Sequence, residues 1–359
     1  MKHREIDRWV ESSFTTLRRS QQKTLAAIVF GALTVGHVTL AALGRAMAGP
    51  VRTKHRIKRV DRFLANRRIE PTEAMRGVAA QLLRPRKKRA IIAVDWVDIR
   101  QRLVLVAALC LPGRAVPLCW AAYEKWQLFK SQNQLEEGLF LVLRSLIPTG
   151  VKVTIVADRG FGRAELARFL DEQGFGYVLR VKGKTYIRNS TYAGNISALG
   201  LRPESCRWLP EVAFRKTRPV RTRLAILWRR GAREPWILIS NVAASADVAA
   251  AAYERRMRIE ELFRDQKNVR NGWALRQVEI GKTDRLERLL LILAAAYLVL
   301  IMAGLAAGRQ YDPRDWSSSS KAGSLSLWQL GRLLLDHLDV KLKPLLAILQ
   351  RLIAQEACL

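Results

Sequence analysis

Cysteine and histidine are scarce in this chain of 359 residues, which contains four of each. The cysteines form no Cys-x-x-Cys pair, and no histidine lies at zinc-finger spacing from them. This pattern argues against a structural zinc site and against a disulfide framework, and it fits the reducing cytosol. The four cysteines are Cys110, Cys119, Cys206 and Cys358.

Acidic residues are also in the minority, since 31 Asp and Glu stand against 62 Lys and Arg and leave a formal net charge of +31. A charge of this size attracts polyanions. Basic stretches such as Arg84–Arg89 and Arg215–Arg223 recur along the chain, which indicates a long contact with a phosphate backbone. Nucleic acid is therefore favoured as the partner over an anionic membrane surface or a merely soluble basic surface.

An apolar run at the N-terminus is missing, because the chain opens Met-Lys-His-Arg-Glu-Ile-Asp, so we expect no signal peptide. One uncharged segment, Leu289–Gly308, is about as long as a membrane-spanning helix. Its many Ala and Gly residues suit close helix packing inside a protein. We therefore predict a buried core helix and no membrane partner, with a membrane anchor as the alternative.

The spacing of apolar residues predicts an α/β fold in which a mixed sheet is flanked by helices. Residues 1–75 form a basic helical region in this interpretation, with two short helices broken near residues 34–36 and a basic third. They suggest a DNA-binding module of the helix-turn-helix kind, and a plain helical cap is the alternative. The predicted strands are 90–96, 103–111, 115–122, 151–158, 175–181, 223–229 and 235–240.

The chain divides into five predicted parts. They are the helical region 1–75, the α/β domain in two pieces at 88–181 and 236–310, a β-rich insertion at 182–235, and a helical C-terminal region at 311–359. The predicted helices after residue 90 are 134–146, 163–173, 246–267, 327–335 and 345–357, and the serines at 317–320 indicate a loop.

The segment Tyr253–Lys267 carries the most informative pattern. At 3.6 residues per turn, Arg256, Glu260 and Lys267 fall at roughly −60°, −20° and −40° from Tyr253. An aromatic hydroxyl, a carboxylate and two cations therefore share one face, where a carboxylate can hold a metal while cations bind phosphate. The alternative is a solvated face with intrahelical ion pairs.

Two aspartates lie where apolar strands give out, Asp95 after Ile91-Ile-Ala-Val and Asp158 after Thr154-Ile-Val-Ala. Carboxylates at strand ends project into the crevice where α/β sheets bind ligands, although each could instead cap a turn. With Glu260 they make three carboxylates, and oxygen-only ligation suits Mg²⁺ or Mn²⁺. Glu261, at roughly 80°, and Asp98, on the opposite strand face, are rivals that lie off the shared face.

A family resemblance rests on these residues. Tyr, two residues, Arg, three residues, Glu, six residues and Lys is the signature of the insertion-sequence branch of the DDE transposases. The chain matches this signature at Tyr253, Arg256, Glu260 and Lys267. Asp158, in Ala-Asp-Arg-Gly-Phe-Gly, resembles the second aspartate of the family, and Asp95 resembles the first. The long segment between Asp158 and Glu260 is similar to the family's strand-rich insertion in an RNase H-like domain.

The resemblance implies cut-and-paste DNA transposition by metal-dependent cleavage and strand transfer at the ends of an insertion sequence. Asp95, Asp158 and Glu260 would be catalytic and would hold two Mg²⁺ or Mn²⁺ ions. The implied partners are double-stranded DNA, as terminal inverted repeats and target, and a second copy of the chain in a homodimer on that DNA. The implied location is the bacterial cytoplasm, in association with the nucleoid.

The resemblance also implies residues that contact DNA. These are Tyr253, Arg256, Lys267, Arg159 and Trp236. In the best-studied members cleavage passes through a DNA hairpin, and a Trp in the insertion receives a flipped base, for which Trp236 is placed ahead of Trp208 and Trp228. A strand Trp packed in the core is the alternative. A catalytically inactive, transposase-derived DNA-binding protein is the alternative function.

Overall fold

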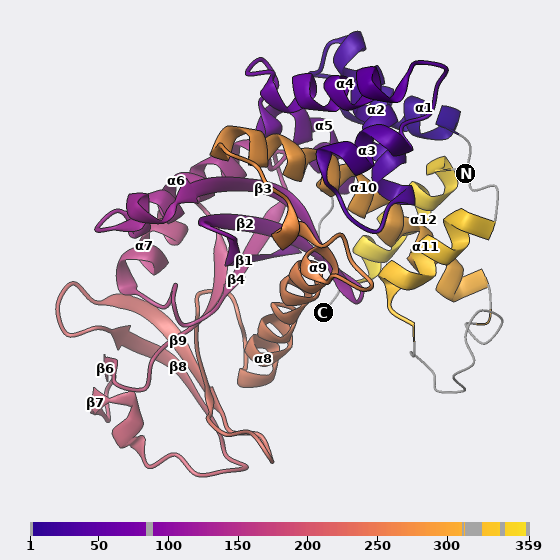
Figure 1. The fold of residues 1–359 in the computed structure, drawn as a ribbon. Coiled ribbons are helices and arrows are strands. Elements are labelled where there is room, and N and C mark those ends of the chain that lie inside the picture. Colours follow the sequence, from indigo (N-terminus) through magenta and orange to yellow (C-terminus); the bar gives the residue numbers. More distant parts are fainter. Residues whose placement is uncertain (1–2, 84–88, 311, 313–324, 338–341, 357–359) are drawn as a thin grey trace.

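The computed structural model describes residues 3–83, 89–310, 312, 325–337 and 342–356 (Figure 1). The serine loop predicted at 317–320, Cys358 and residues 84–88 of the first basic stretch lie outside the described residues.

The described part of the N-terminal region forms five helices. They are α1 (His3–Ser13), α2 (Arg19–Thr34), α3 (Leu40–Ala46), α4 (Thr53–Ala65) and α5 (Pro71–Leu82). The break predicted near residues 34–36 is confirmed, and Thr39 caps α3 by accepting a hydrogen bond of 3.2 Å from the Ala42 amide. The basic run folds as α4, which buries Val60, Phe63 and Leu64 and leaves its cations on the other side.

Ten strands of the described chain form one mixed sheet. They are β1 (Arg89–Ile99), β2 (Arg102–Leu111), β3 (Arg114–Glu124), β4 (Lys152–Ala157), β5 (Gly176–Arg180), β6 (Tyr186–Arg188), β7 (Ala193–Asn195), β8 (Cys206–Phe214), β9 (Val220–Leu227) and β10 (Trp236–Ser240). The order is β3-β2-β1-β4-β5-β10-β9-β8-β6-β7. β1, β4 and β5 are parallel to one another, and the other paired strands are antiparallel.

The first half of this order, β3-β2-β1-β4-β5, is that of an RNase H-like sheet, so the predicted fold class is confirmed. The region 182–235 supplies β6 to β9 and joins this sheet through β10, which pairs with β5 on one side and β9 on the other. The β-rich region is therefore continuous with the sheet that carries the candidate site.

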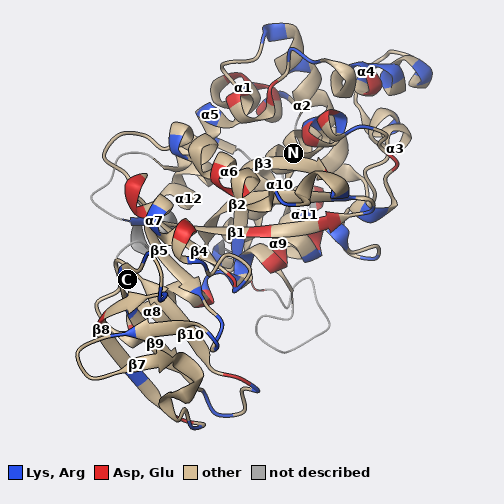
Figure 2. Ribbon diagram, turned by 90° about the vertical axis from the view of Figure 1, so that its left-hand side faces the viewer, with Lys and Arg blue, Asp and Glu red and all other residues tan. Residues whose placement is uncertain are grey.

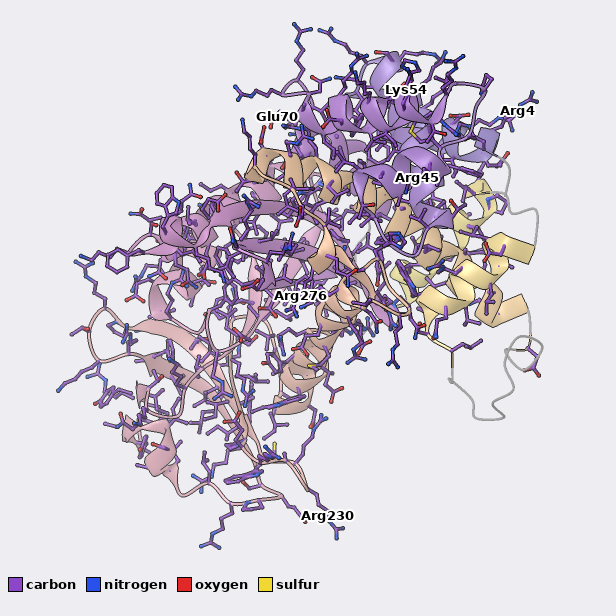
Figure 3. All side chains as sticks on the ribbon, in the orientation of Figure 1. Arg4, Arg45, Lys54, Glu70, Arg230 and Arg276 are labelled. Carbon is purple, nitrogen blue, oxygen red and sulfur yellow. The ribbon has the colours of Figure 1, made fainter. Side chains whose placement is uncertain are left out.

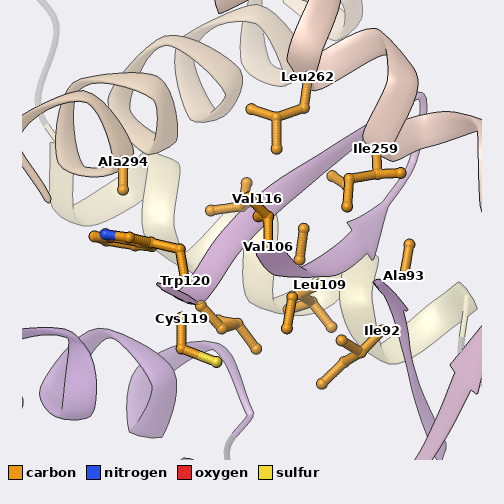
Figure 4. Packing of buried hydrophobic residues seen from close by; sticks show 14 of the residues in the cluster. Ile92, Ala93, Val106, Leu109, Val116, Cys119, Trp120, Ile259, Leu262 and Ala294 are labelled. Atoms are coloured by element: carbon orange, nitrogen blue, oxygen red, sulfur yellow. The ribbon is translucent and has the colours of Figure 1, made fainter. Parts of the chain in front are cut away.

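Helices cover both faces of the first half of the sheet, which explains why most of β2 is buried on both sides. Two of them are α6 (Gln132–Leu146) and α7 (Ala164–Glu172), and three more are α8 (Ala246–Glu254), α9 (Met257–Lys267) and α10 (Thr283–Gln310). Figure 4 shows Ile259 and Leu262 of α9 directed at the strands, close to Val106 and Val116. This packing fixes the distance of α9 from β1.

The apolar helix α10 is a core helix. It is the one helix among the described residues that is long and apolar enough to cross a membrane, and its apolar window is 100% buried inside the protein. It packs against β3, α2 and two C-terminal helices, α11 (Leu327–His337) and α12 (Leu342–Glu356). Gly304 allows this closeness, because a Cβ there would lie 2.0 Å from the carbonyl oxygen of Leu327. The predicted buried helix at 289–308 is therefore confirmed.

Candidate active site

Asp95 and Asp158 occupy matching positions on neighbouring parallel strands. The last paired residues of β1 and β4 are Val94 and Ala157, and the two aspartates come next. Residues in register on parallel strands point to the same face of a sheet, so both carboxylates lie on one face. The expectation that Asp95 ends its strand is wrong, because β1 continues to Ile99 along β2. Asp158 does directly follow the end of β4.

Local hydrogen bonds hold both aspartates. The Asp95 Oδ1 atom accepts from the backbone amide of Trp96 at 2.8 Å, and the Asp158 Oδ1 atom accepts from that of Gly160 at 2.8 Å. Asp158 therefore caps the turn after β4, as the turn-capping alternative predicted. It also lies beside Asp95. The two roles are compatible because a carboxylate has several acceptor positions.

The helix predicted over 246–267 is two helices, and this part of the prediction is wrong. α8 ends at Glu254 and α9 begins at Met257. Between them the amide of Arg256 donates to the Tyr253 carbonyl at 2.9 Å and the amide of Ile259 donates to the Arg256 carbonyl at 3.1 Å. These i→i−3 bonds are those of a tighter, 3₁₀-like turn, which changes the angular positions on either side of it.

The guanidinium of Arg256 joins two of the three predicted carboxylates. Its Nη1 atom lies 3.2 Å from Asp95 Oδ2, and its Nη2 atom lies 2.6 Å from Glu260 Oε1. Arg256 is 11% exposed, Asp95 19% and Glu260 42%, so this cluster lies at the edge of solvent. The sequence prediction that Arg256 and Glu260 share a face is borne out by this contact.

The three carboxylates share one electrostatic environment. Burial, together with the negative charges of Asp158 and Glu260, raises the pKa of Asp95 to about 6, and the Arg256 guanidinium limits the rise. Carboxylates that repel one another are stabilised by a cation placed among them.

This donor set fits a hard divalent ion in its chemistry, since it offers oxygen atoms alone. Within the described ranges, however, no three Asp, Glu, His or Cys residues lie close enough to hold one ion. In this arrangement the Arg256 side chain lies between Asp95 and Glu260 and donates to both. Asp95 and Asp158 could hold a metal as a pair, and Glu260 could join them once Arg256 releases it.

Tyr253 lies deeper than its predicted place on the shared face. Its side chain is only 3% exposed, and its ring meets the ring of Trp236 edge-on at 5.1 Å between centroids. Burial raises the pKa of Tyr253. Two buried donors here, Tyr253 Oη and Arg256 Nε, have no hydrogen-bond partner among the residues that the structure describes. Because both atoms are buried, an acceptor from outside the chain reaches them only when the neighbouring side chains move.

Trp236 is a half-buried strand residue whose ring is already in contact with other side chains. The guanidinium carbon of Arg229 lies 4.8 Å from the centre of its ring, in addition to the contact with Tyr253. Trp228 instead lines an open hollow of about 410 Å³ with Arg159, Arg180 and Lys182. Trp208, on β8, packs against the core.

The two remaining predicted cations are Arg159, which directly follows Asp158, and Lys267, which lies seven residues after Glu260. Arg159 is exposed and donates from Nη1 to Glu234 at 3.2 Å, and Arg180 pairs with the same carboxylate at 2.8 Å. Lys267 ends α9, where burial lowers its pKa while the charges of Asp98 and Asp95 oppose the change.

Sequence reasoning missed the ion pair that holds α9 in place. The Asp265 Oδ2 atom accepts from Arg114 Nε of β3 at 2.8 Å and from Tyr297 Oη of α10 at 2.8 Å. Asp265 and Arg114 are 9% and 11% exposed. The available signal was an acidic residue close to Leu262 on the inner side of the helix, but its partners are 151 and 32 residues away.

Comparison with known proteins relates part of this chain to a protein family. Residues 131–299 match the transposase DDE domain. No curated protein matches the chain. The matched segment contains Asp158 and Glu260 and the whole Tyr253–Lys267 signature, whereas Asp95 lies before it. The match supports a DNA substrate and a transposase function.

Proposed function

We propose that this protein is a transposase that cuts DNA at the ends of an insertion sequence and joins those ends to target DNA. The proposal rests on the positions of three carboxylates. Asp95 and Asp158 directly follow the last paired residues of β1 and β4, and Glu260 lies beside them. Asp158 and Glu260 belong to the segment that matches the transposase DDE domain, and Asp95 precedes it. The three carboxylates are the proposed catalytic residues.

Asp95, Asp158 and Glu260 would hold Mg²⁺ or Mn²⁺. Two bound ions would supply Lewis acidity that activates a water or a 3′-hydroxyl and stabilises the leaving oxygen of a phosphodiester. The chain contributes the positions of the carboxylates: the sheet orients the aspartates, and the buried ion pair of Arg114 with Asp265 fixes α9. The scarcity of histidine is consistent with this chemistry.

The cations beside the carboxylates are the proposed phosphate ligands. The unpartnered donors Tyr253 Oη and Arg256 Nε support an anion binding there. Lys267, which is half-buried, and Arg159, which is exposed, would bind neighbouring phosphates. When Arg256 releases Glu260, its charge becomes free to bind the DNA backbone.

The N-terminal helices are the proposed DNA-recognition region. α4 leaves Lys54, Lys58, Arg59 and Arg62 exposed along one side. Figure 2 shows basic positions on α4 and on the outer strands, and Figure 3 shows Lys54 and Arg230 at opposite ends of the molecule. Basic side chains spread this widely support contact with a long stretch of inverted repeat, in a homodimer that holds both DNA ends.

Trp236 remains the proposed base-stacking residue of the insertion, although Arg229 and Tyr253 already contact its ring. A base would therefore have to displace the Arg229 side chain to reach the ring. A catalytically inactive DNA-binding protein is the second candidate function. It is favoured by one observation, which is that Arg256 neutralises Asp95 and Glu260.

The deciding experiment uses DNA that carries the inverted repeats flanking the gene. We expect purified protein with Mg²⁺ to cleave at the element boundary. Asp95→Ala, Asp158→Ala and Glu260→Gln should each abolish cleavage and leave DNA binding intact. Glu261→Gln is the matched control, since Glu261 neighbours Glu260 but ion-pairs with Arg264 at 3.0 Å and Arg114 at 3.7 Å instead of Arg256. Full cleavage by the Glu260→Gln protein would contradict the assignment.

A further inference from the structure

Two aromatic side chains project into solvent just beyond the end of β3. Trp126 is 76% exposed and Phe129 is 77% exposed. Within the described part of the chain they are the only aromatic residues among the strongly exposed large hydrophobic ones. They belong to the segment 125–131, which joins β3 to α6 and begins with the short helix η1 (Lys125–Leu128).

Hydrogen bonds and an ion pair hold the backbone of this segment, although both aromatic rings are exposed. The amide of Glu124 donates to Gln127 Oε1 at 2.8 Å, and the Glu124 carboxylate binds Arg102 Nε at 2.9 Å. Ser131 Oγ donates to the carbonyl of Gln127. Lys130 adopts a left-handed conformation with a φ of 59°, which a residue with a side chain adopts only when its surroundings require it. The fold therefore orders this segment while leaving both rings uncovered.

The segment lies at the edge of the sheet where the candidate carboxylates lie. β1 and β3 are both antiparallel to β2, and their ends meet through the pairs of Arg102 with Ile99 and with Glu124. Lys125 Nζ forms an ion pair of 3.0 Å with Asp98. Asp98 is three residues beyond Asp95 on β1, about 10 Å along the strand, and at this odd spacing it faces the opposite side of the sheet from Asp95.

The chemistry of the segment matches DNA. Exposed aromatic rings stack on bases of any sequence, and cations beside them bind the adjoining phosphates. Lys125 and Lys130 flank the rings, and Lys130 Nζ lies 5.2 Å from the centre of the Phe129 ring. A protein interface of the same size is usually poor in lysine, which favours DNA over a second protein.

We propose that Trp126 and Phe129 form an aromatic wedge that stacks on bases of the bound DNA where the DNA passes the end of β1 and β3. Lys125 and Lys130 bind the neighbouring phosphates. The wedge opens a base step and holds the duplex in a bent form. This inference rests on the proposed DNA substrate, but it concerns a site separate from the catalytic carboxylates.

The test compares the unstacking of bases in DNA that is bound by the wild-type protein or by the Trp126→Ala/Phe129→Ala double variant. The probe is a duplex ending in the inverted repeat that flanks the gene, with 2-aminopurine placed at successive positions, and no divalent ion is added so that the DNA stays intact. We expect wild-type protein to raise 2-aminopurine fluorescence and permanganate reactivity at one base step. The double variant should lose both signals and bind about tenfold to a hundredfold more weakly.

Two controls separate stacking from folding. Leu141→Ala removes a side chain on α6 that is 50% exposed and should change neither signal. Trp126→Phe keeps an aromatic ring and should retain most of the fluorescence change. Equal unstacking by wild type and double variant would overturn the proposal. So would a loss of self-association with unchanged DNA signals, which would make the pair an interface between copies of the chain.

The outcome also separates this proposal from the proposed function. If the wild-type protein cleaves its ends and the double variant unstacks DNA normally, only the wedge is wrong. If the wild-type protein neither binds nor cleaves the DNA, both proposals fail together.

Discussion

Arg256 donates a hydrogen bond from Nη1 to the Oδ2 atom of Asp95 at 3.2 Å, across 161 residues of sequence. The same guanidinium binds Glu260 at 2.6 Å, so a cation of the protein lies where the proposed function needs a metal. Release of this contact would expose the carboxylates to metal and the guanidinium to DNA phosphate in one movement.

Replacing Arg256 should therefore increase metal affinity in the absence of DNA. Arg256→Gln removes the competing charge, and a hydrogen bond to a charged group contributes about 1.5–3 kcal/mol, so Mn²⁺ should bind roughly ten to a hundred times more tightly. The same variant should bind DNA more weakly. Calorimetric titration with Mn²⁺ and a gel-shift assay measure the two effects.

Arg264→Gln is the control for that experiment, because Arg264 lies on the same helix, is 66% exposed and pairs only with Glu261 among the contacts described. It should leave Mn²⁺ affinity unchanged. An Arg256→Gln protein whose Mn²⁺ affinity equals that of the wild type would show that Arg256 does not compete with the metal.

Asp95 should make the stability of the metal-free protein depend on pH. Its pKa is raised from 3.8 to about 6, chiefly by burial, so the folded chain binds this proton more tightly than the unfolded chain. Stability from this group is then greatest below pH 4 and falls as the pH rises towards 6. Because one pKa unit corresponds to about 1.4 kcal/mol, ionising Asp95 costs the folded chain at most about 3 kcal/mol at neutral pH.

Asp95→Asn should accordingly be more stable than the wild type at pH 7, and the difference should vanish near pH 4. Urea unfolding at several pH values with a chelator present measures it. Asp98→Asn, at a side chain on the same strand that is 43% exposed, is the control variant. Added Mg²⁺ should stabilise the wild type and leave Asp95→Asn unaffected.

Removing one partner of the buried ion pair between Arg114 and Asp265 should lower the free energy of unfolding. Asp265→Ala leaves a guanidinium that is 11% exposed without its closest partner, and such a loss typically costs about 3–5 kcal/mol. Urea unfolding measures the loss. The double variant Arg114→Met/Asp265→Leu removes both charges and should recover most of the stability, whereas a loss below about 1 kcal/mol in Asp265→Ala would contradict the anchoring role.

The strands that carry the site could be predicted because each is an apolar run bounded by turn residues. This was enough to locate Asp95 and Asp158 on neighbouring elements, and the register of β1 and β4 then brought them side by side. The continuation of β1 to Ile99 was missed because Asp95 and Asp98 interrupt the apolar pattern. Their positions depend on pairing with β2, which local sequence does not encode.

The break between α8 and α9 could not be predicted from the residues around it. Arg255 and Arg256 are good helix formers with helical dihedral angles, and neither Gly nor Pro is present there. The i→i−3 turn accompanies long-range contacts, in which Tyr253 packs on Trp236 while Arg256 reaches Asp95. A helical wheel contains no information about such partners, so it predicted the neighbourhood of Arg256 and Glu260 and missed the burial of Tyr253.

The packing of α10 against α11 gives a test of whether the apolar segment is a core helix in solution. A Cβ at Gly304 would lie 2.0 Å from the Leu327 carbonyl oxygen, whereas one at Gly308 would meet only Leu330 Cδ1 at 3.8 Å. Gly304→Ala should therefore destabilise the protein by about 1–3 kcal/mol through overpacking. Gly308→Ala should be neutral or stabilising by up to about 1 kcal/mol, because alanine favours a helix over glycine. Thermal unfolding of the two variants measures the contrast, and equal stability would mean that α11 does not pack on α10 in solution.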